Sequence, residues 1–296
     1  MGERIGHVEG VLSPDGLRGA VVHSSAHLGV LAVAKGVVAF ALLSVPLNAA
    51  LVVGLLAAVP VYAHNRLRDG VEDGVNAPSR AAFLEGRERS LAVASAAAYL
   101  GALVVAALGG ALALLLTAAP GVAGALYSET WIPVGDADRL KEVPVVNTAV
   151  VAGAWAVPLG VLPLAFADVA PGYGAAFVVA FFFLRTVVAV EVLNVRDVRG
   201  DRRADVPTLP ADHGVDATRR VLAALDAATL ALLLAGAATG AVPVPVALAL
   251  LPALGCSVAV TALLTTGVDR SRLCACKDAE YVLMACCVLA VGVVGA

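Results

Sequence analysis

The sequence predicts an all-α polytopic membrane protein with nine transmembrane helices. Of its 296 residues, 60% are hydrophobic, and the mean hydropathy is +0.91. Soluble domains contain only about 45–50% apolar residues. Apolar runs near 20 residues recur along the chain, which is about the length needed to cross a hydrocarbon core of roughly 30 Å. Because the charged residues gather in a few connections, the net charge of −3 carries little information.

Nine apolar segments are candidates for membrane-spanning helices. Residues 1–26 are mixed in polarity, and we expect a cytoplasmic lead-in there, followed by one transmembrane domain over residues 27–296. The abundance of Ala, Val and Gly gives the spans small side-chain faces, which suits close helix packing in lipid. The expected spans are residues 28–45, 49–63, 91–108, 111–127, 143–166, 173–193, 221–239, 242–266 and 279–294.

Lysine and arginine alternate along the connections between these spans. Every second connection carries them, and the intervening connections carry none. This is the pattern that the positive-inside rule requires of nine helices with a cytoplasmic N-terminus. The sequence therefore predicts a multi-pass cell-membrane protein with its charged connections on the cytoplasmic side. Those connections are residues 64–90, 128–142, 194–220 and 267–278.

Three aspartates follow the sixth span at intervals of four residues: Asp197, Asp201 and Asp205. Residues at this spacing lie near one face of a helix with about 3.6 residues per turn. Stacked carboxylates repel one another unless a cation lies between them. Arginines are interleaved with them, and the alternative reading is a solvated surface segment that pairs with itself.

The same spacing follows the second span, at Asn65, Asp69 and Asp73. We call this set the first ladder, and Asn194, Asp197 and Asp201 with Asp205 the second ladder. The alternating charges place both ladders on the cytoplasmic side. Mg²⁺ prefers oxygen ligands and binds one or two carboxylates together with phosphate oxygens. Two facing ladders therefore predict a site for Mg²⁺ and a diphosphate, in which metals neutralise the charge of the leaving group.

The paired ladders resemble the motifs of the UbiA superfamily of intramembrane prenyltransferases. That family carries N-D-x-x-D-x-x-x-D after its second helix and D-x-x-D-x-x-x-D after its sixth, in a nine-helix bundle. The Thr-Leu-Pro at residues 208–210 and the Arg-Leu-Lys at residues 139–141 also resemble family patterns, as does Asn147. Two positions depart from the pattern, since Arg66 and Asn194 stand where many members have aspartate.

The resemblance implies a UbiA-like bundle with a cytoplasmic-side site that transfers a polyprenyl group from its diphosphate to an aromatic or lipid acceptor. Mg²⁺ is the implied cofactor, and the acceptor is left open. The expected metal ligands are Asp69, Asp73, Asp197 and Asp201. The expected diphosphate contacts are Asn65, Arg139, Lys141, Asn194 and Arg199, and the expected catalytic residues are Lys141 and Glu191.

Three charged residues fall inside the predicted spans: Lys35, Arg185 and Glu191. Charge inside a membrane is costly, so such residues are usually paired or functional. Arg185 and Glu191 are six residues apart and cannot meet on one helix face. Two readings of Glu191 stay open, a pair with Lys35 across helices and a place in the wall of the pocket.

A membrane transporter with interfacial acidic motifs is the alternative function. Transporters built from internal repeats bind their substrates near the bilayer midplane. Both ladders lie at the ends of spans, so their position favours the enzyme over the transporter.

Overall fold

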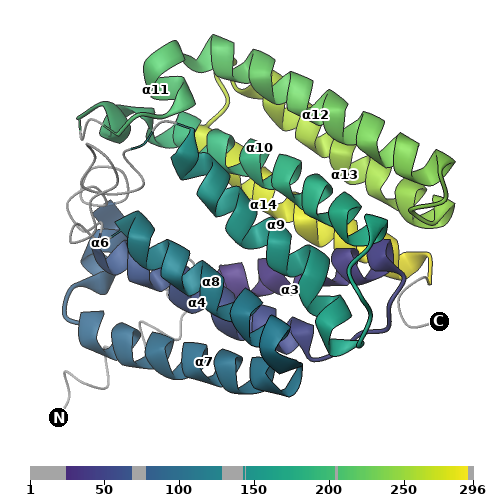
Figure 1. The fold of residues 1–296 in the computed structure, drawn as a ribbon. Helices are drawn as coiled ribbons and strands as arrows, with labels where there is room; N and C mark the ends of the chain where they lie inside the picture. Colours follow the sequence, from purple (N-terminus) through teal and green to yellow (C-terminus); the bar gives the residue numbers. More distant parts are fainter. Residues whose placement is uncertain (1–24, 69–77, 129–142, 144, 204–205, 293–296) are drawn as a thin grey trace.

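Every regular element that the computed structural model describes is an α-helix (Figure 1). It describes residues 25–68, 78–128, 143, 145–203 and 206–292. The all-α prediction is therefore confirmed for this part of the chain. The helices are α3 (Ala26–Leu43), α4 (Ala50–Arg68), α6 (Pro78–Leu84), α7 (Glu88–Leu108), α8 (Gly110–Ser128), α9 (Val146–Phe166), α10 (Tyr173–Arg203), α11 (Leu209–His213), α12 (Val215–Ala238), α13 (Val244–Leu263) and α14 (Arg270–Ala290).

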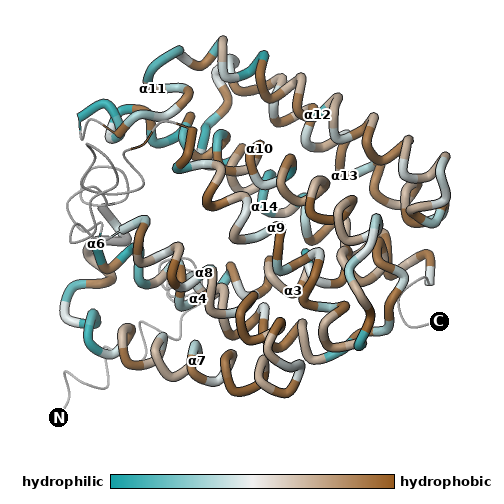
Figure 2. Tube along the Cα trace, viewed as in Figure 1, coloured by the Kyte–Doolittle hydropathy of each residue, from teal (hydrophilic) through white to brown (hydrophobic). Residues whose placement is uncertain are grey.

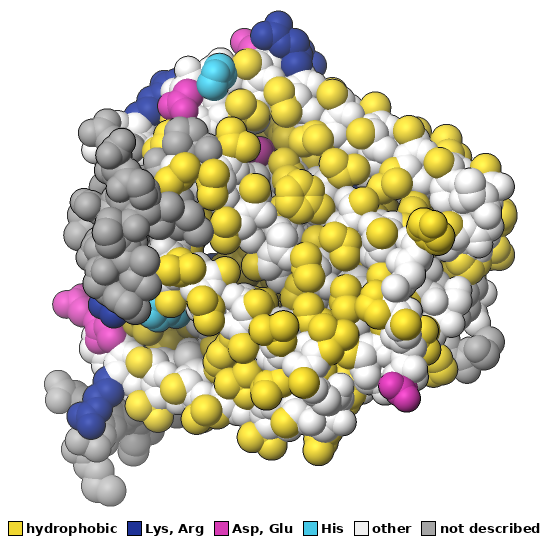
Figure 3. Space-filling view, viewed as in Figure 1, with side chains coloured by type: hydrophobic (Ala, Val, Ile, Leu, Met, Phe, Trp, Pro, Cys, Tyr) yellow, Lys and Arg dark blue, Asp and Glu magenta, His cyan; other side chains and the backbone are white. Residues whose placement is uncertain are grey.

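Eight of the described helices are long and apolar enough to cross a membrane, and they correspond to the first eight predicted spans. The ninth predicted span falls in α14, which has 21 residues but carries five charged side chains. Figure 3 shows one face of the molecule covered largely by apolar side chains. The hydrophilic residues gather mostly at the end of the bundle where α6 and α11 lie (Figure 2). This distribution is what a bundle embedded in lipid requires.

The helices α3, α9, α10 and α14 form the middle of the bundle (Figure 1). On one side α4 packs against α3, and α7 and α8 pack outside it; on the other side α12 and α13 pack against α10 and α14. Side chains from α3, α10, α12, α13 and α14 share one buried apolar core. The centre of that core includes Phe181 and Phe182 of α10, which are both fully buried and whose rings meet edge to face.

The helix α10 is longer than the predicted sixth span. It runs unbroken from Tyr173 to Arg203, so Asn194, Asp197 and Asp201 of the second ladder occupy its last turns, where the sequence predicted a loop from residue 194. Hydropathy detects where a segment leaves the apolar core, whereas the helix itself continues to Arg203, four residues before Pro207. Proline disfavours helical backbone in the residue before it. In the same way, α4 continues to Arg68 and carries Asn65 and Arg66 on its last turns.

The helix α14 begins nine residues earlier than its predicted span. Asp269 caps its start, accepting a hydrogen bond from the Ser271 amide at 3.0 Å. The prediction of a cytoplasmic loop over residues 267–278 was therefore wrong for residues 270–278. Lys277, which we counted among the loop charges, is 2% exposed and lies inside the bundle.

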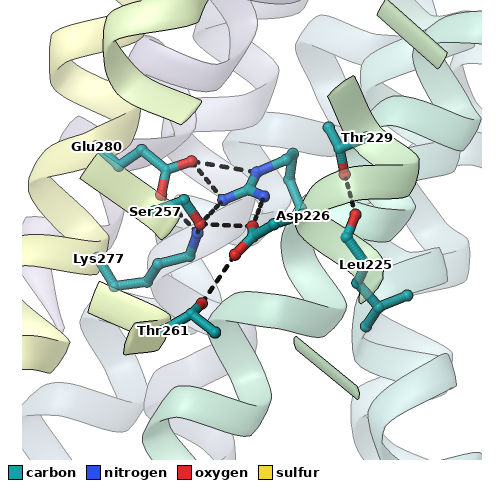
Figure 4. A network of polar contacts seen from close by, with 8 residues as sticks. Leu225, Asp226, Thr229, Ser257, Thr261, Lys277 and Glu280 are labelled. Atoms are coloured by element: carbon teal, nitrogen blue, oxygen red, sulfur yellow. Dashed lines mark hydrogen bonds and ion pairs between the residues drawn. The ribbon is translucent and has the colours of Figure 1, made fainter. Parts of the chain in front are cut away.

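Four charged side chains meet in the interior between α10, α12, α13 and α14. Arg185 of α10 is fully buried and donates to Asp226 of α12 and to Glu280 of α14, both at 2.6 Å. Lys277 pairs with Glu280. Two positive and two negative charges are thus brought together without a net charge (Figure 4).

Two hydroxyl groups complete this network. Ser257 of α13 accepts from Arg185 and from Lys277 and donates to Asp226 at 2.7 Å. Thr261, one turn later, donates to the second oxygen of Asp226 at 2.8 Å. Because the bonds join four helices, the network fixes α14 against α10 and α12. The sequence reading recognised Arg185 as a buried charge but missed all of its partners.

Close contact between α9 and α10 depends on Gly160. A Cβ atom there would lie 2.5 Å from Val179 Cγ2 and 2.9 Å from the Ala175 carbonyl oxygen. Small residues of this kind let helix backbones approach in lipid. By contrast, a Cβ atom added to Gly153 on the same helix would have open space within 4 Å.

We predict that Gly160→Ala destabilises the bundle by about 1–3 kcal/mol, because the added methyl group forces α10 away from α9. The free energy of unfolding in mixed micelles, from a denaturing-detergent titration, measures the change. Gly153→Ala is the matched control and should leave stability unchanged or raise it slightly. Equal effects of the two substitutions would contradict the role given to Gly160.

We also predict that Arg185→Met destabilises the protein by about 3–5 kcal/mol, because it leaves two carboxylates buried with one cation. The same titration measures this loss. Arg220→Met, at an exposed position of α12, should cost little. Adding Asp226→Asn to Arg185→Met restores neutrality and should recover part of the stability; a double variant no better than the single one would show that charge balance is not the cause.

Candidate functional site

A cavity of about 770 Å³ lies between α3, α4, α8, α9, α10 and α14. Its wall changes character along the bundle. Polar side chains from the ends of α4, α9 and α10 line one part, whereas Phe40, Leu51, Leu116 and Leu162 line another. A ligand that fits this cavity therefore has a polar group and an apolar body.

The described members of both ladders line this one cavity. Asn65 lies on α4, and Asn194, Asp197 and Asp201 lie on α10. The expected site residues Asp69, Asp73, Arg139 and Lys141 lie outside the described residues, as does Asp205.

Hydrogen bonds tie these helix ends together. Ser128, the last residue of α8, donates to Asn65 Oδ1 at 2.7 Å. Thr208 donates to Asp201 Oδ2 at 3.2 Å, and Asn147 of α9 donates to the Pro207 carbonyl at 3.0 Å. Arg270 at the start of α14 donates to the Val195 carbonyl at 2.9 Å. The polar part of the cavity is thus built where five helices begin or end.

Asp197 is held by its sequence neighbour Arg196. The guanidinium donates from Nε at 2.7 Å and from Nη2 at 2.6 Å to the two carboxylate oxygens. Such a bidentate pair is geometrically specific. This is the self-pairing that the interleaved arginines suggested. Asp201 also lines the cavity and accepts a hydrogen bond from the neutral hydroxyl group of Thr208.

The donor set suits a hard cation. Asp197, Asp201 and the amides of Asn65 and Asn194 offer oxygen atoms to one cavity, and Mg²⁺ binds such ligands. Within the described ranges, no group of three or more His, Cys, Asp or Glu side chains is close enough to hold a metal ion. Two carboxylates are nevertheless the number that Mg²⁺ commonly takes from protein when phosphate oxygens supply further ligands.

Glu191 is buried and does not itself line the cavity, although its hydrogen-bond partners Thr148 and Asn194 do. It is 5% exposed, and its carboxylate accepts from Thr148 Oγ1 at 2.6 Å and from Asn194 Nδ2 at 3.2 Å. A pair with Lys35 was also expected as an alternative, and the described residues contain none. Because a carboxylate only accepts, the bond turns the amide nitrogen of Asn194 toward Glu191 and leaves Oδ1 for a ligand.

Arg199 is exposed and is absent from the cavity wall. The continuity of α10 explains this, since two residues of helix place Arg199 about 200° around the axis from Asp197. Arg66, one residue after Asn65, does line the cavity. A guanidinium group cannot bind a metal ion, but it suits the oxygens of a phosphate.

A second set of functional groups lies deeper in the cavity. Lys35 of α3 is 4% exposed, with its Nζ 3.7 Å from the centroid of the Trp155 ring and 4.3 Å from that of Tyr281. Trp155 donates from its indole nitrogen to Tyr62 Oη at 2.7 Å. Asp278 of α14 lines the same part of the cavity. Recognising the cap at Asp269 would have placed Asp278 and Tyr281 inside a helix of the bundle.

The sequence profile of the UbiA prenyltransferase family matches residues 23–274. No curated protein matches the sequence. Among solved structures, a UbiA homologue from Aeropyrum pernix K1 has a TM-score of 0.69 at 16% identity, covering 88% of this chain and 97% of that one.

Two other structures are similar over nearly their whole length. A UbiA homologue from Archaeoglobus fulgidus bound to GPP and Mg²⁺ has a TM-score of 0.64 at 15% identity, covering 92% of this chain and 98% of that one. A digeranylgeranylglyceryl phosphate synthase has a TM-score of 0.61 at 13% identity, covering 94% and 98%. At such identities the likeness establishes the fold.

Arg66 lines the cavity and Arg199 does not, and this difference leads to a prediction about diphosphate binding. Arg66→Gln should weaken the binding of inorganic diphosphate, in the presence of Mg²⁺, by about tenfold or more, because it removes a charge-assisted contact worth about 1.5–3 kcal/mol. Isothermal titration measures the dissociation constant. Arg199→Gln removes the same charge outside the cavity and should change it less than twofold. A larger effect at Arg199 than at Arg66 would contradict this assignment.

Proposed function

Because the chain belongs to the UbiA prenyltransferase family, we propose that it is a Mg²⁺-dependent intramembrane enzyme that transfers a polyprenyl group from its diphosphate to a hydrophobic acceptor. The observation that carries this proposal is the composition of one cavity. The described members of both ladders meet at its polar part, and apolar side chains line the remainder. An isoprenoid diphosphate has the same division, with a charged group at one end of a hydrocarbon chain.

The two ladders form the proposed binding site for the diphosphate and its metal ions. Asp197 and Asp201 bind Mg²⁺, together with Asp69 and Asp73 from the segment after α4. Asn65 and Asn194 add amide oxygens; Asn65 matches the family's motif, whereas Asn194 stands where many members have aspartate. Bound Mg²⁺ supplies charge neutralisation as the diphosphate leaves the allylic carbon. One relative is a structure with GPP and Mg²⁺ bound, which supports this assignment by analogy.

The neighbouring residues have supporting roles. Arg66 contacts the phosphate oxygens from α4, and Arg139 and Lys141 do so from the segment before α9. Lys141 is the proposed catalytic cation, because an ammonium group beside the leaving diphosphate stabilises the charge that develops there. Glu191 acts through Asn194, whose amide it orients, so we assign it a positioning role.

The apolar part of the cavity takes the isoprenoid chain. Phe40, Leu51, Leu116 and Leu162 line it, and they offer the chain an environment like lipid. Water must be kept from the allylic cation that forms when the carbon–oxygen bond breaks, because it would capture the cation. A dry, apolar wall therefore serves the chemistry as well as the binding.

We expect Asp197→Ala and Asp69→Ala to abolish the Mg²⁺-dependent binding of geranylgeranyl diphosphate, because each removes a carboxylate that holds the metal. Binding to protein in detergent, measured by titration with and without Mg²⁺, checks this expectation. Asp216→Ala, at an exposed position of α12, is the matched control and should bind like the wild type. If both ladder variants bind the diphosphate as tightly as the control, the proposed site is wrong.

A further inference from the structure

The deeper part of the cavity holds a buried cation without an anion bound to it. Lys35 Nζ lies against the rings of Trp155 and Tyr281, which stabilise its charge through cation–π contacts. An ammonium group still has three N–H donors to satisfy. Within the part of the chain that the structure describes, Lys35 forms no hydrogen bond or ion pair. It lines the cavity, so these donors are directed to whatever the cavity holds.

Asp278 supplies the opposite charge in the same wall. It lies on α14 one turn before Tyr281 and lines the cavity. Lys35 and Asp278 act on each other through their charges, as do His27 of α3 and Arg196 of α10 on Asp278. No ion pair joins Lys35 and Asp278 among the described residues. The two groups therefore face the cavity as a separate donor and a separate acceptor.

Two other cations near this pair are each held by a carboxylate. Arg196 is held by Asp197, and Lys277 is held by Glu280. The positive charge of Lys35 and the negative charge of Asp278 sum to zero. An anionic ligand would gain from Lys35 but would be repelled by Asp278, whereas a hydroxyl group accepts from the ammonium and donates to the carboxylate.

The position of Lys35 and Asp278 relative to the ladders suits the acceptor, which is the second reactant of the proposed transfer. Tyr62, which hydrogen-bonds to Trp155, lies three residues before Asn65 on α4, about 4.5 Å deeper along the helix. A molecule bound here would lie beside the diphosphate-bearing end of a donor. Its apolar body would share the cavity with the isoprenoid chain.

We propose that Lys35 and Asp278 form the acceptor subsite and that this subsite selects an acceptor through an uncharged hydroxyl group. The inference rests on the proposed function and deepens it by naming the class of acceptor. Lys35 donates to the hydroxyl oxygen, Asp278 accepts its proton in a hydrogen bond, and the hydroxyl bridges the two. Carboxylate and phosphate headgroups are disfavoured by the carboxylate of Asp278.

The test uses farnesol, farnesyl methyl ether and farnesoate as probes. Trp131→Phe leaves Trp155 as the one tryptophan of a chain that has two, so its fluorescence reports on the subsite. Each probe is titrated with and without Mg²⁺ and geranyl thiolodiphosphate, a donor analogue that does not ionise. We expect farnesol to bind at least about tenfold more tightly than the ether, which lacks the O–H donor, and more tightly than farnesoate.

Lys35→Met and Asp278→Asn should each reduce the preference for farnesol over the ether to about twofold or less. Both should bind the thiolodiphosphate like the parent protein, which shows that they fold. Asp168→Asn is the matched control, because Asp168 is exposed at the opposite end of α10 and asparagine tolerates its left-handed backbone, with φ of 55°.

Three results would overturn the proposal: equal affinity for farnesol and its ether, tighter binding of farnesoate than of farnesol, or a preference that survives in both variants. The second result would identify a subsite for anions around Lys35. If the thiolodiphosphate itself fails to bind the parent protein, the proposed function fails. The relative affinities of the three probes, measured without the thiolodiphosphate, still test the hydroxyl subsite.

Discussion

A charge inside a membrane bundle must find its counter-charge within the bundle, because lipid offers none. The network around Arg185 satisfies that requirement with Asp226, Glu280 and Lys277, and the hydroxyl groups of Ser257 and Thr261 occupy the remaining lone pairs. The rest of the structure depends on this neutral cluster. It joins α10, which carries the second ladder, to α14, which carries Asp278 and Tyr281. Two of the helices that line the cavity are thus held together by one buried set of bonds.

The positions of the spans were predictable from the sequence because membrane insertion depends on apolar length, and eight predicted spans coincide with described helices. The ends of the helices were harder to predict from the sequence. Hydropathy reports where a segment leaves the apolar core, so it ended the sixth span near Leu193 although α10 continues to Arg203. It also placed Lys277 in a loop, since a span with five charged residues does not look like one.

The ladders themselves were predictable from spacing, because residues three or four apart share a helix face. Contacts between side chains on different helices were not predictable in this way. Asp226, Glu280 and Lys277 are far from Arg185 in the sequence, and their contact follows from how four helices pack. For the same reason the expected pair of Lys35 and Glu191 was wrong: Glu191 turns to Thr148 and Asn194, and Lys35 turns to two aromatic rings. Arg199 failed as a cavity residue because a continuous α10 turns it away from Asp197.

The length of α10 has a consequence for how products would leave. Its 31 residues extend about 46 Å at about 1.5 Å per residue, more than a hydrocarbon core of roughly 30 Å. Asn194 lies about 32 Å from Tyr173 along α10, which is about the thickness of the hydrocarbon core. On the proposed function, the freed diphosphate then partitions directly into the aqueous phase, while the alkylated acceptor remains dissolved in the bilayer. The two products separate by solubility alone, and diffusion in different phases makes the transfer effectively one-way.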